Sequence, residues 1–152
     1  MRTIISVIFV TGILFSCQQP GAVVSVTKAP VDSLINNWCK SWNKHDSAAV
    51  QNLFLPDALL IDDDLIAANV TDLSGKWIQK GIKVVNNLKA TKLQEWSEAG
   101  RAGYTGTYQL DIIVNDSVMA KPAGVFTINW LKTTDGQWKI TTATIHSFTK
   151  KS

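Results

Sequence analysis

The chain has 152 residues, of which 45% are hydrophobic and six are tryptophans, so it has the length of one domain and enough apolar surface for a packed core. Fifteen Lys and Arg residues against twelve Asp and Glu residues give a formal net charge of +3. Because this excess is small and the one basic cluster is Lys150–Lys151 at the very end, we expect no binding to nucleic acid.

The first sixteen residues have the pattern of an export signal. Arg2 precedes an apolar run, Ile4 to Phe15, that is too short for a helix to span a bilayer of ~30 Å. The stretch LFSC that ends at Cys17 resembles the lipobox of bacterial lipoproteins, whose cysteine is acylated after cleavage. We therefore expect a signal peptide at residues 1–16 and a lipid on Cys17. The protein would then be exported and anchored in the bacterial cell envelope, on its periplasmic or outer-membrane face. An ordinary secretory signal, cut nearby, would instead leave Cys17 as a free thiol.

Residues 17–29 are predicted to be a flexible tether, because they include a Pro-Gly pair and show neither helical nor strand periodicity. The folded domain then spans residues 30–152. If Cys17 carries lipid, Cys39 has no cysteine partner, so an intrachain disulfide is excluded. Cys39 follows Trp38 in a helical pattern, which favours a small buried core residue over a nucleophile.

Two helices are predicted next. From Pro30 onward, apolar residues recur at the spacing of one helical face: Val31, Leu34, Ile35, Trp38 and Trp42. Asp46 is placed to cap a second helix that ends before Pro56 and whose apolar side consists of Ala49, Val50, Leu53 and Phe54. His45, in the last turn before that cap, would face the negative end of the first helix. Structural roles thus explain both residues, and a catalytic His45–Asp46 pair is the alternative.

The middle of the chain is predicted to alternate between strand and helix. Residues 57–62 have the pattern of a strand. The acidic run Asp62–Asp64 is predicted to be a solvated loop, because a calcium loop needs alternating oxygen ligands and a glycine at its sharp turn. Residues 75–81 are predicted to form a short strand and residues 82–90 a helix.

The C-terminal half has strand periodicity. Residues 101–114 alternate between an apolar and a polar face. Residues 124–148 are predicted to form a hairpin around a two-residue turn at Asp135-Gly136, which pairs Trp130 with Thr141. One face of the hairpin then carries Phe126, Ile128, Trp130, Ala143 and Ile145. The wetter face carries Val125, Thr127, Asn129, Thr142, Thr144 and His146, so an antiparallel sheet with one packed face is expected.

Four stretches of this pattern carry a family resemblance: WCKSWNKHDSAAVQNLFLPDALL, QKGIKVVNNL, GYTGTYQL and GVFTINWLKTTDGQWKI. Over about residues 30–148 the chain resembles the nuclear transport factor 2-like superfamily and, within it, the bacterial SnoaL-like branch. The resemblance implies an α+β, cystatin-like fold. In this fold a curved antiparallel sheet wraps around N-terminal helices as a cone, with a pocket in its concave mouth.

The resemblance also implies chemistries that can be weighed against these residues. Isomerases, cyclases and dehydratases of the superfamily use a pocket aspartate or histidine as general base. Many SnoaL-like members carry an aspartate on the last strand, and that position falls at or near Ala143, which cannot move a proton. The face expected to point inward is aromatic: Trp38, Trp42, Phe54, Tyr104, Tyr108, Phe126 and Trp130.

Three functions follow as hypotheses. The first is binding of a small, largely apolar molecule in an aromatic-lined pocket, although the same rings could simply fill the core. The second is an enzyme of the isomerase, cyclase or dehydratase kind whose base is one of Asp62–Asp64, Glu95, Glu98 or His45. The third is a homodimer formed through the polar outer face of the sheet, as family members often form. No cofactor or metal motif is present, so neither is expected.

Overall fold

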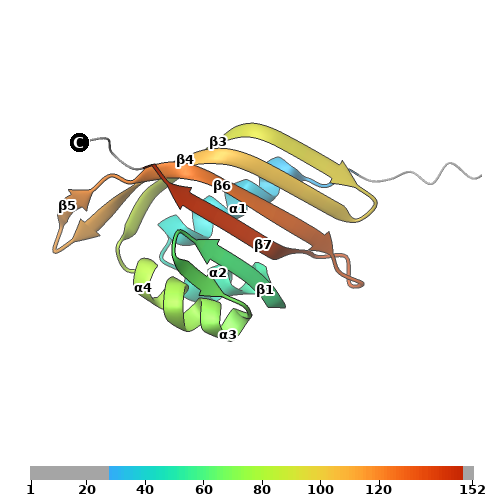
Figure 1. Ribbon diagram of the computed structural model, residues 1–152, viewed down its shortest axis with the longest axis horizontal. Coiled ribbons are helices and arrows are strands. Elements are labelled where there is room, and N and C mark those ends of the chain that lie inside the picture. The colour runs from blue at the N-terminus through green and yellow to red at the C-terminus, as the bar shows by residue number, and fades with distance from the viewer. Residues whose placement is uncertain (1–27, 149–152) are drawn as a thin grey trace, which may run out of the picture.

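The computed structural model describes residues 28–148 (Figure 1). Its helices are α1 (Val31–Asn43), α2 (Ser47–Asn52), α3 (Val70–Leu73), the π-helix η1 (Ser74–Ile78) and α4 (Gln79–Gly81). Its strands are β1 (Phe54–Asp62), β2 (Leu65–Ala67), β3 (Val85–Glu98), β4 (Arg101–Val114), β5 (Ser117–Ala120), β6 (Ala123–Lys132) and β7 (Trp138–Ser147). The predicted signal peptide, the lipid site at Cys17 and the tether up to residue 27 lie outside the described residues. Between residues 28 and 148, no helix has the length and apolar character needed to cross a membrane.

Seven strands form one strongly curled sheet, in the order β2-β1-β7-β6-β4-β3, with β5 paired to the end of β4. All neighbours are antiparallel except β1 and β7, which are parallel. In Figure 1 the long strands lie side by side and α1 crosses the face that they enclose, with the short helices beyond β1 and β2. The predicted α+β cone is confirmed.

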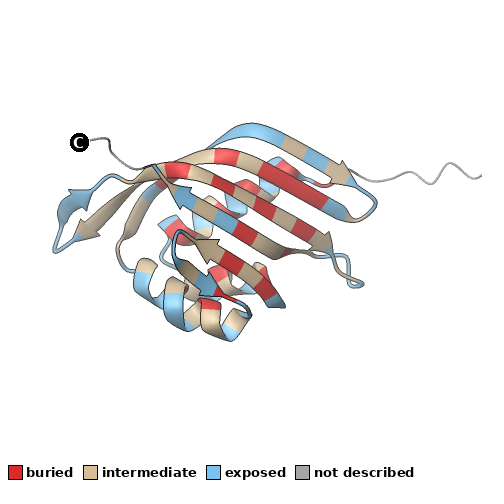
Figure 2. Ribbon diagram, viewed as in Figure 1, coloured by how far each residue is buried: buried red, intermediate tan, exposed pale blue. Residues whose placement is uncertain are grey.

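The core lies between α1 and the inner face of the sheet. The predicted helical stripe is confirmed at Val31, Ile35, Trp38 and Trp42, all at most 5% exposed. The sheet opposes it with alternating buried residues, which appear as red bands along the strands in Figure 2. Each fully buried aliphatic side chain in this layer contributes ~1.5–3 kcal/mol relative to an exposed one, so the helix stripe holds the curl of the sheet.

The second helix begins as predicted and ends earlier. Its cap is confirmed, because the Asp46 carboxylate accepts the Ala49 backbone N–H at 2.9 Å. Phe54 was expected on this helix but is the first residue of β1. There it packs edge-on against Trp38, with ring centroids 5.8 Å apart, so tertiary packing outweighs the helical pattern. Pro56, expected to stop the helix, lies within β1 in the stretch where pairing to β7 is interrupted.

The prediction for residues 75–90 is wrong. Residues 75–81 are helical and close the run α3, η1 and α4, whereas β3 begins at Val85 inside the predicted helix. Asn69 starts the helical run by accepting the Asp72 N–H at 2.9 Å, and Leu73 and Ile78 anchor it with no exposed surface. The sequence does not predict β3, because it is an edge strand whose side chains are mostly exposed and therefore do not alternate in hydrophobicity.

The C-terminal hairpin is confirmed in its faces and corrected in its turn. Phe126, Ile128, Trp130 and Ala143 are buried, and His146 is exposed. A register shift after Asn129 places Trp130 opposite Ile140 instead of Thr141. The turn is longer than two residues, because the Thr133 N–H donates to the Gln137 carbonyl at 2.7 Å and Gly136 adopts a φ of 84°. β5, which no sequence pattern predicted, follows β4 as a second hairpin.

Replacing Asp46 by alanine should lower the free energy of unfolding by about 1 kcal/mol, because the α2 cap is lost. Urea unfolding measures it. Asp57→Ala is the control, because Asp57 is exposed on β1 and its side chain makes no hydrogen bond to the described residues. This substitution removes the same charge and should change the free energy of unfolding by less than about 0.5 kcal/mol. Equal effects of the two substitutions would contradict the capping role.

Candidate functional site

A cavity of about 400 Å³ lies between the helices and one end of the sheet. Most of its wall is apolar. The helical side contributes Trp38, Trp42 and Trp77, and the sheet contributes Leu65, Val85, Leu88, Ala90, Leu110, Ile112, Phe126 and Ile145. The polar groups in the wall are Cys39, Asp62, Lys76, Lys80, Tyr108 and Ser147. A concave apolar surface with a few polar groups is the usual form of a small-molecule site.

Trp77 stands at the centre of the aromatic wall. Its ring centroid lies 5.8 Å from that of Trp38, in a stacked arrangement, and 4.7 Å from that of Trp42, edge-on. It belongs to the π-helix η1, and single π-turns inside helices are frequent at functional sites. The sequence pattern does not predict Trp77 as a site residue, because residues 75–81 were expected to be a strand.

Asp62 brings a carboxylate into this apolar wall. It is the last residue of β1, and its Oδ2 accepts a hydrogen bond from the Trp77 Nε1–H at 2.6 Å. Burial raises the pKa of the Asp62 carboxyl, the Trp77 hydrogen bond opposes that rise, and the neighbouring charge of Asp63 adds to it. The expectation of a solvated Asp62–Asp64 loop is therefore wrong for Asp62, because the strand continues to it and turns its side chain into the cavity.

A second polar pair lies in the wall, in the middle of β4 and at the end of β7. The Tyr108 hydroxyl and the Ser147 Oγ are 3.0 Å apart, and burial raises the pKa of the Tyr108 phenol. Behind them, Asp63 accepts the Ser147 backbone N–H at 3.1 Å and contacts His146 Nδ1 at 2.9 Å. The hydrogen bonds from Ser147 and the nearby imidazole hold the pKa of the Asp63 carboxyl below its ordinary value. Two adjacent carboxyls thus have pKa values pushed in opposite directions.

One buried donor among the wall residues has no hydrogen-bond partner within residues 28–148. Trp42 is 3% exposed, and its indole Nε1 makes no hydrogen bond to the described residues. An unsatisfied buried N–H costs ~1–3 kcal/mol of stability, which the packing of the Trp42 ring must offset. Cys39 contributes no comparable group, since burial raises the pKa of its thiol to about 11 and keeps it protonated near neutral pH.

A family model described as a SnoaL-like domain matches residues 31–147. The chain belongs to the SnoaL-like family. The comparison with curated proteins gives no match. Among solved structures, this SnoaL-like domain is similar to a nuclear transport factor 2-like superfamily protein from Salmonella enterica, with a TM-score of 0.67 and 14% identity over 80% of this chain and 91% of that one.

Two further solved structures share the fold. A ketosteroid isomerase-like protein from Erwinia carotovora atroseptica gives a TM-score of 0.66 at 13% identity, covering 78% of this chain and 94% of that one. A nuclear transport factor 2-like protein with a cystatin-like fold from Novosphingobium aromaticivorans gives 0.63 at 11% identity, covering 80% and 82%. At these identities the likeness establishes the architecture of the SnoaL-like domain and leaves its ligand to the residues of the cavity.

Of the seven aromatic residues predicted to bind a ligand, Trp38, Trp42, Tyr108 and Phe126 line the cavity of the SnoaL-like domain. The other three lie outside its wall. Phe54 sits behind Trp38 and Trp77 in the core. Tyr104 lies behind the wall, with its ring centroid 5.4 Å from that of Phe126. Trp130 is four residues along β6 from Phe126, which displaces it by about 13 Å toward the far end of the sheet. The shared inward face that the alternation predicts is therefore longer than the cavity.

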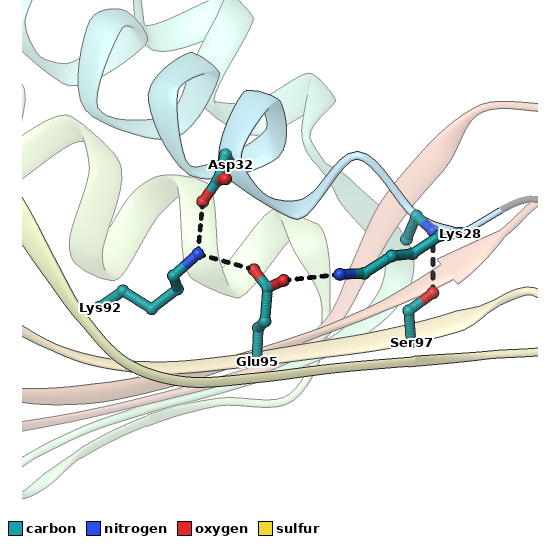
Figure 3. Close-up of polar contacts among 6 residues, drawn as sticks. Lys28, Asp32, Lys92, Glu95 and Ser97 are labelled. Atoms are coloured by element: carbon teal, nitrogen blue, oxygen red, sulfur yellow. Dashed lines mark hydrogen bonds and ion pairs between the residues drawn. The ribbon is translucent and has the colours of Figure 1, made fainter.

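The other candidate bases are engaged elsewhere. Glu95 lies between Lys28 and Lys92, at 3.0 and 3.1 Å, and hydrogen bonds from these two ammonium groups lower the pKa of its carboxyl (Figure 3). His45 is exposed, and its Nε2 contacts the Val85 carbonyl oxygen at 3.0 Å. Glu98 is exposed at the end of β3. Among residues 28–148, no three His, Cys, Asp or Glu side chains gather where they could hold a metal ion.

Proposed function

We propose that the SnoaL-like domain binds a small, largely apolar molecule in the cavity walled by Trp38, Trp42 and Trp77. The observation that carries this proposal is the cavity itself, whose volume of about 400 Å³ and apolar wall suit a compact ring system. Within the apolar wall, the Tyr108 hydroxyl and the Ser147 Oγ supply polar contacts for a substituent on the ligand. Together they favour a molecule that is mostly apolar and carries one or two polar substituents.

Blocking the cavity tests this proposal. Ala90 lines it from β3, so Ala90→Phe should fill it and weaken binding of the neutral fluorophore N-phenyl-1-naphthylamine by more than about tenfold. Thr91→Phe is the matched control, because Thr91 is exposed and neighbouring strand residues point to opposite faces. Fluorescence titration gives both affinities. If wild type does not bind the fluorophore, or if Ala90→Phe binds it as wild type does, the cavity is not a binding site.

A specific observation also favours a second candidate, proton transfer of the isomerase, cyclase or dehydratase kind. Asp62 is a carboxyl in an apolar cavity with its pKa raised by burial, as a general base requires. Deuterium exchange at the α-carbon of the apolar ketone 2-tetralone, followed by NMR, is the test. Wild type and the exposed-position control Asp64→Asn should accelerate exchange, and Asp62→Asn should not. Exchange at the buffer rate with wild type would leave binding as the function.

Two further expectations belong to this proposal. A lipid on Cys17 would hold the cavity at the surface of the cell envelope, and mass spectrometry of the mature N-terminus would detect it. A homodimer through the outer face of the sheet would cover Trp96, which is 44% exposed and borders a second hollow with Arg101 and Asn129. Sedimentation of the folded domain, with Trp96→Ala for comparison, tests the dimer.

A further inference from the structure

The charge inside the cavity is unbalanced. Asp62 is the one carboxylate among the described residues of the wall. Within residues 28–148 its side chain has one hydrogen-bond partner, the Trp77 indole. No Lys, Arg or His nitrogen of residues 28–148 lies within 4.0 Å of it. An anion that is half removed from water and lacks a cationic partner is costly, and a positively charged ligand would offset that cost.

The two lysines of the wall do not provide this partner. The Lys76 ammonium contacts the Asp72 carboxylate at 2.7 Å, one helical turn away. Lys80 is exposed on α4, so water and salt screen its charge. An anionic ligand would meet these solvated ammonium groups only at the rim and would be repelled by Asp62 further in. The charge of the wall therefore favours a cation over an anion.

The aromatic wall suits a cation as well. The Asp62 carboxylate touches the Trp77 indole, so a cation paired with Asp62 lies beside that ring. Trp42 and Trp38 are the next rings, with centroids 4.7 and 5.8 Å from that of Trp77. Tryptophan is the best aromatic partner for a cation, and alkylammonium groups bind against aromatic side chains of this type. The same surface accommodates the apolar body of such a molecule.

We propose that the cavity selects an organic cation, an alkyl- or arylammonium compound whose charged group pairs with Asp62 and whose apolar part lies against Trp77 and Trp42. This inference rests on the proposed binding function and names its ligand class. It assigns Asp62 the role of counter-ion. The hydrogen bond from Trp77 then orients the carboxylate toward the ligand without neutralising it.

Three probes of the same shape and different charge test the inference at pH 8. They are 3-hydroxyphenyltrimethylammonium, its neutral isostere 3-tert-butylphenol and the anion 3-hydroxybenzenesulfonate. Calorimetric titration should show that the cation binds at least about tenfold more tightly than the neutral isostere. Asp62→Asn should abolish that preference, so that the cation and 3-tert-butylphenol bind alike. Asp64→Asn, which removes the same charge from an exposed turn outside the wall, should retain it.

The outcomes separate this inference from the function on which it rests. If the neutral isostere binds as tightly as the cation, the cavity is an apolar site and the inference fails while the proposed function stands. If the anion binds most tightly and Lys80→Gln removes its binding, the ligand class is anionic and the inference fails. If none of the probes binds and N-phenyl-1-naphthylamine does not bind either, both fail together.

Discussion

Trp38→Ala should lower the free energy of unfolding by about 3–5 kcal/mol, the usual cost of removing a large buried aromatic side chain. Trp38 is 4% exposed, and its ring packs against those of Trp42, Phe54 and Trp77 at centroid distances of 6.1, 5.8 and 5.8 Å. Trp42 belongs to α1 itself, Phe54 to β1 and Trp77 to η1. The substitution therefore weakens the packing of α1 against both β1 and η1. Because domains of this size are stable by about 5–15 kcal/mol, the substitution would remove a large part of the folding stability.

Urea unfolding followed by circular dichroism measures this effect. Trp96→Ala removes an identical side chain that is 44% exposed, and it should cost less than about 1 kcal/mol. Trp38→Phe retains an aromatic ring in the cluster and should fall between the two. If Trp38→Ala were no more destabilising than Trp96→Ala, the aromatic cluster would not be the core that holds the helices to the sheet.

The elements whose burial follows a simple period could be predicted from the sequence. The α1 stripe, the Asp46 cap and the alternating faces of β4, β6 and β7 all lie where residue spacing places them. Each of these elements packs one face against the core and leaves the other less buried, so the spacing of its apolar residues shows which face is buried. The local turn chemistry was less informative, since the hairpin after Lys132 uses a longer turn than its Asp-Gly pair suggests.

The residues of the cavity could be predicted only in part, because Trp77 has no clear period around it and Asp62 is not distinguished from its two acidic neighbours. Trp77 lies on a π-helix, whose spacing fits neither the helical nor the strand template. Asp62 ends a strand inside an acidic run that has the composition of a solvated loop. The hydrogen bond between them joins residues 15 positions apart, so it follows from the fold and not from either local sequence.

Asp62 also shows why a binding site need not favour stability. Its carboxyl is more easily ionised in the unfolded chain, where water solvates it, than in the cavity wall, where its pKa is raised. The folded state therefore keeps its proton to higher pH. The cost to stability is absent below the unfolded-state pKa, grows as pH rises from there to the folded-state pKa and is complete above it, so at neutral pH the domain retains a destabilising charge. A group with this property is typical of functional sites.

Trp77→Phe should increase this cost. Phenylalanine keeps most of the ring and removes the indole N–H, which is the one donor that the described residues offer to the Asp62 carboxylate. The pKa of Asp62 should rise further, because the hydrogen bond that favours its ionised form is lost. At pH 7 we expect a loss of about 1–2 kcal/mol from the missing charge-assisted bond, discounted for the solvent that reaches a half-buried group. At acidic pH, where the carboxyl is protonated in both states, this part of the loss should shrink.

A double-mutant cycle with Asp62→Leu separates the hydrogen bond from the smaller ring volume of phenylalanine. Leucine has the shape of aspartate and accepts no hydrogen bond, so Trp77→Phe in that background reports the packing change alone. The coupling energy between positions 62 and 77 should be about 1–2 kcal/mol at pH 7 and smaller near pH 3. A coupling near zero at pH 7, or one that grows as pH falls, would mean that the indole does not stabilise the ionised carboxylate. Asp62 would then need another source for the orientation that both the binding and the proton-transfer proposals require.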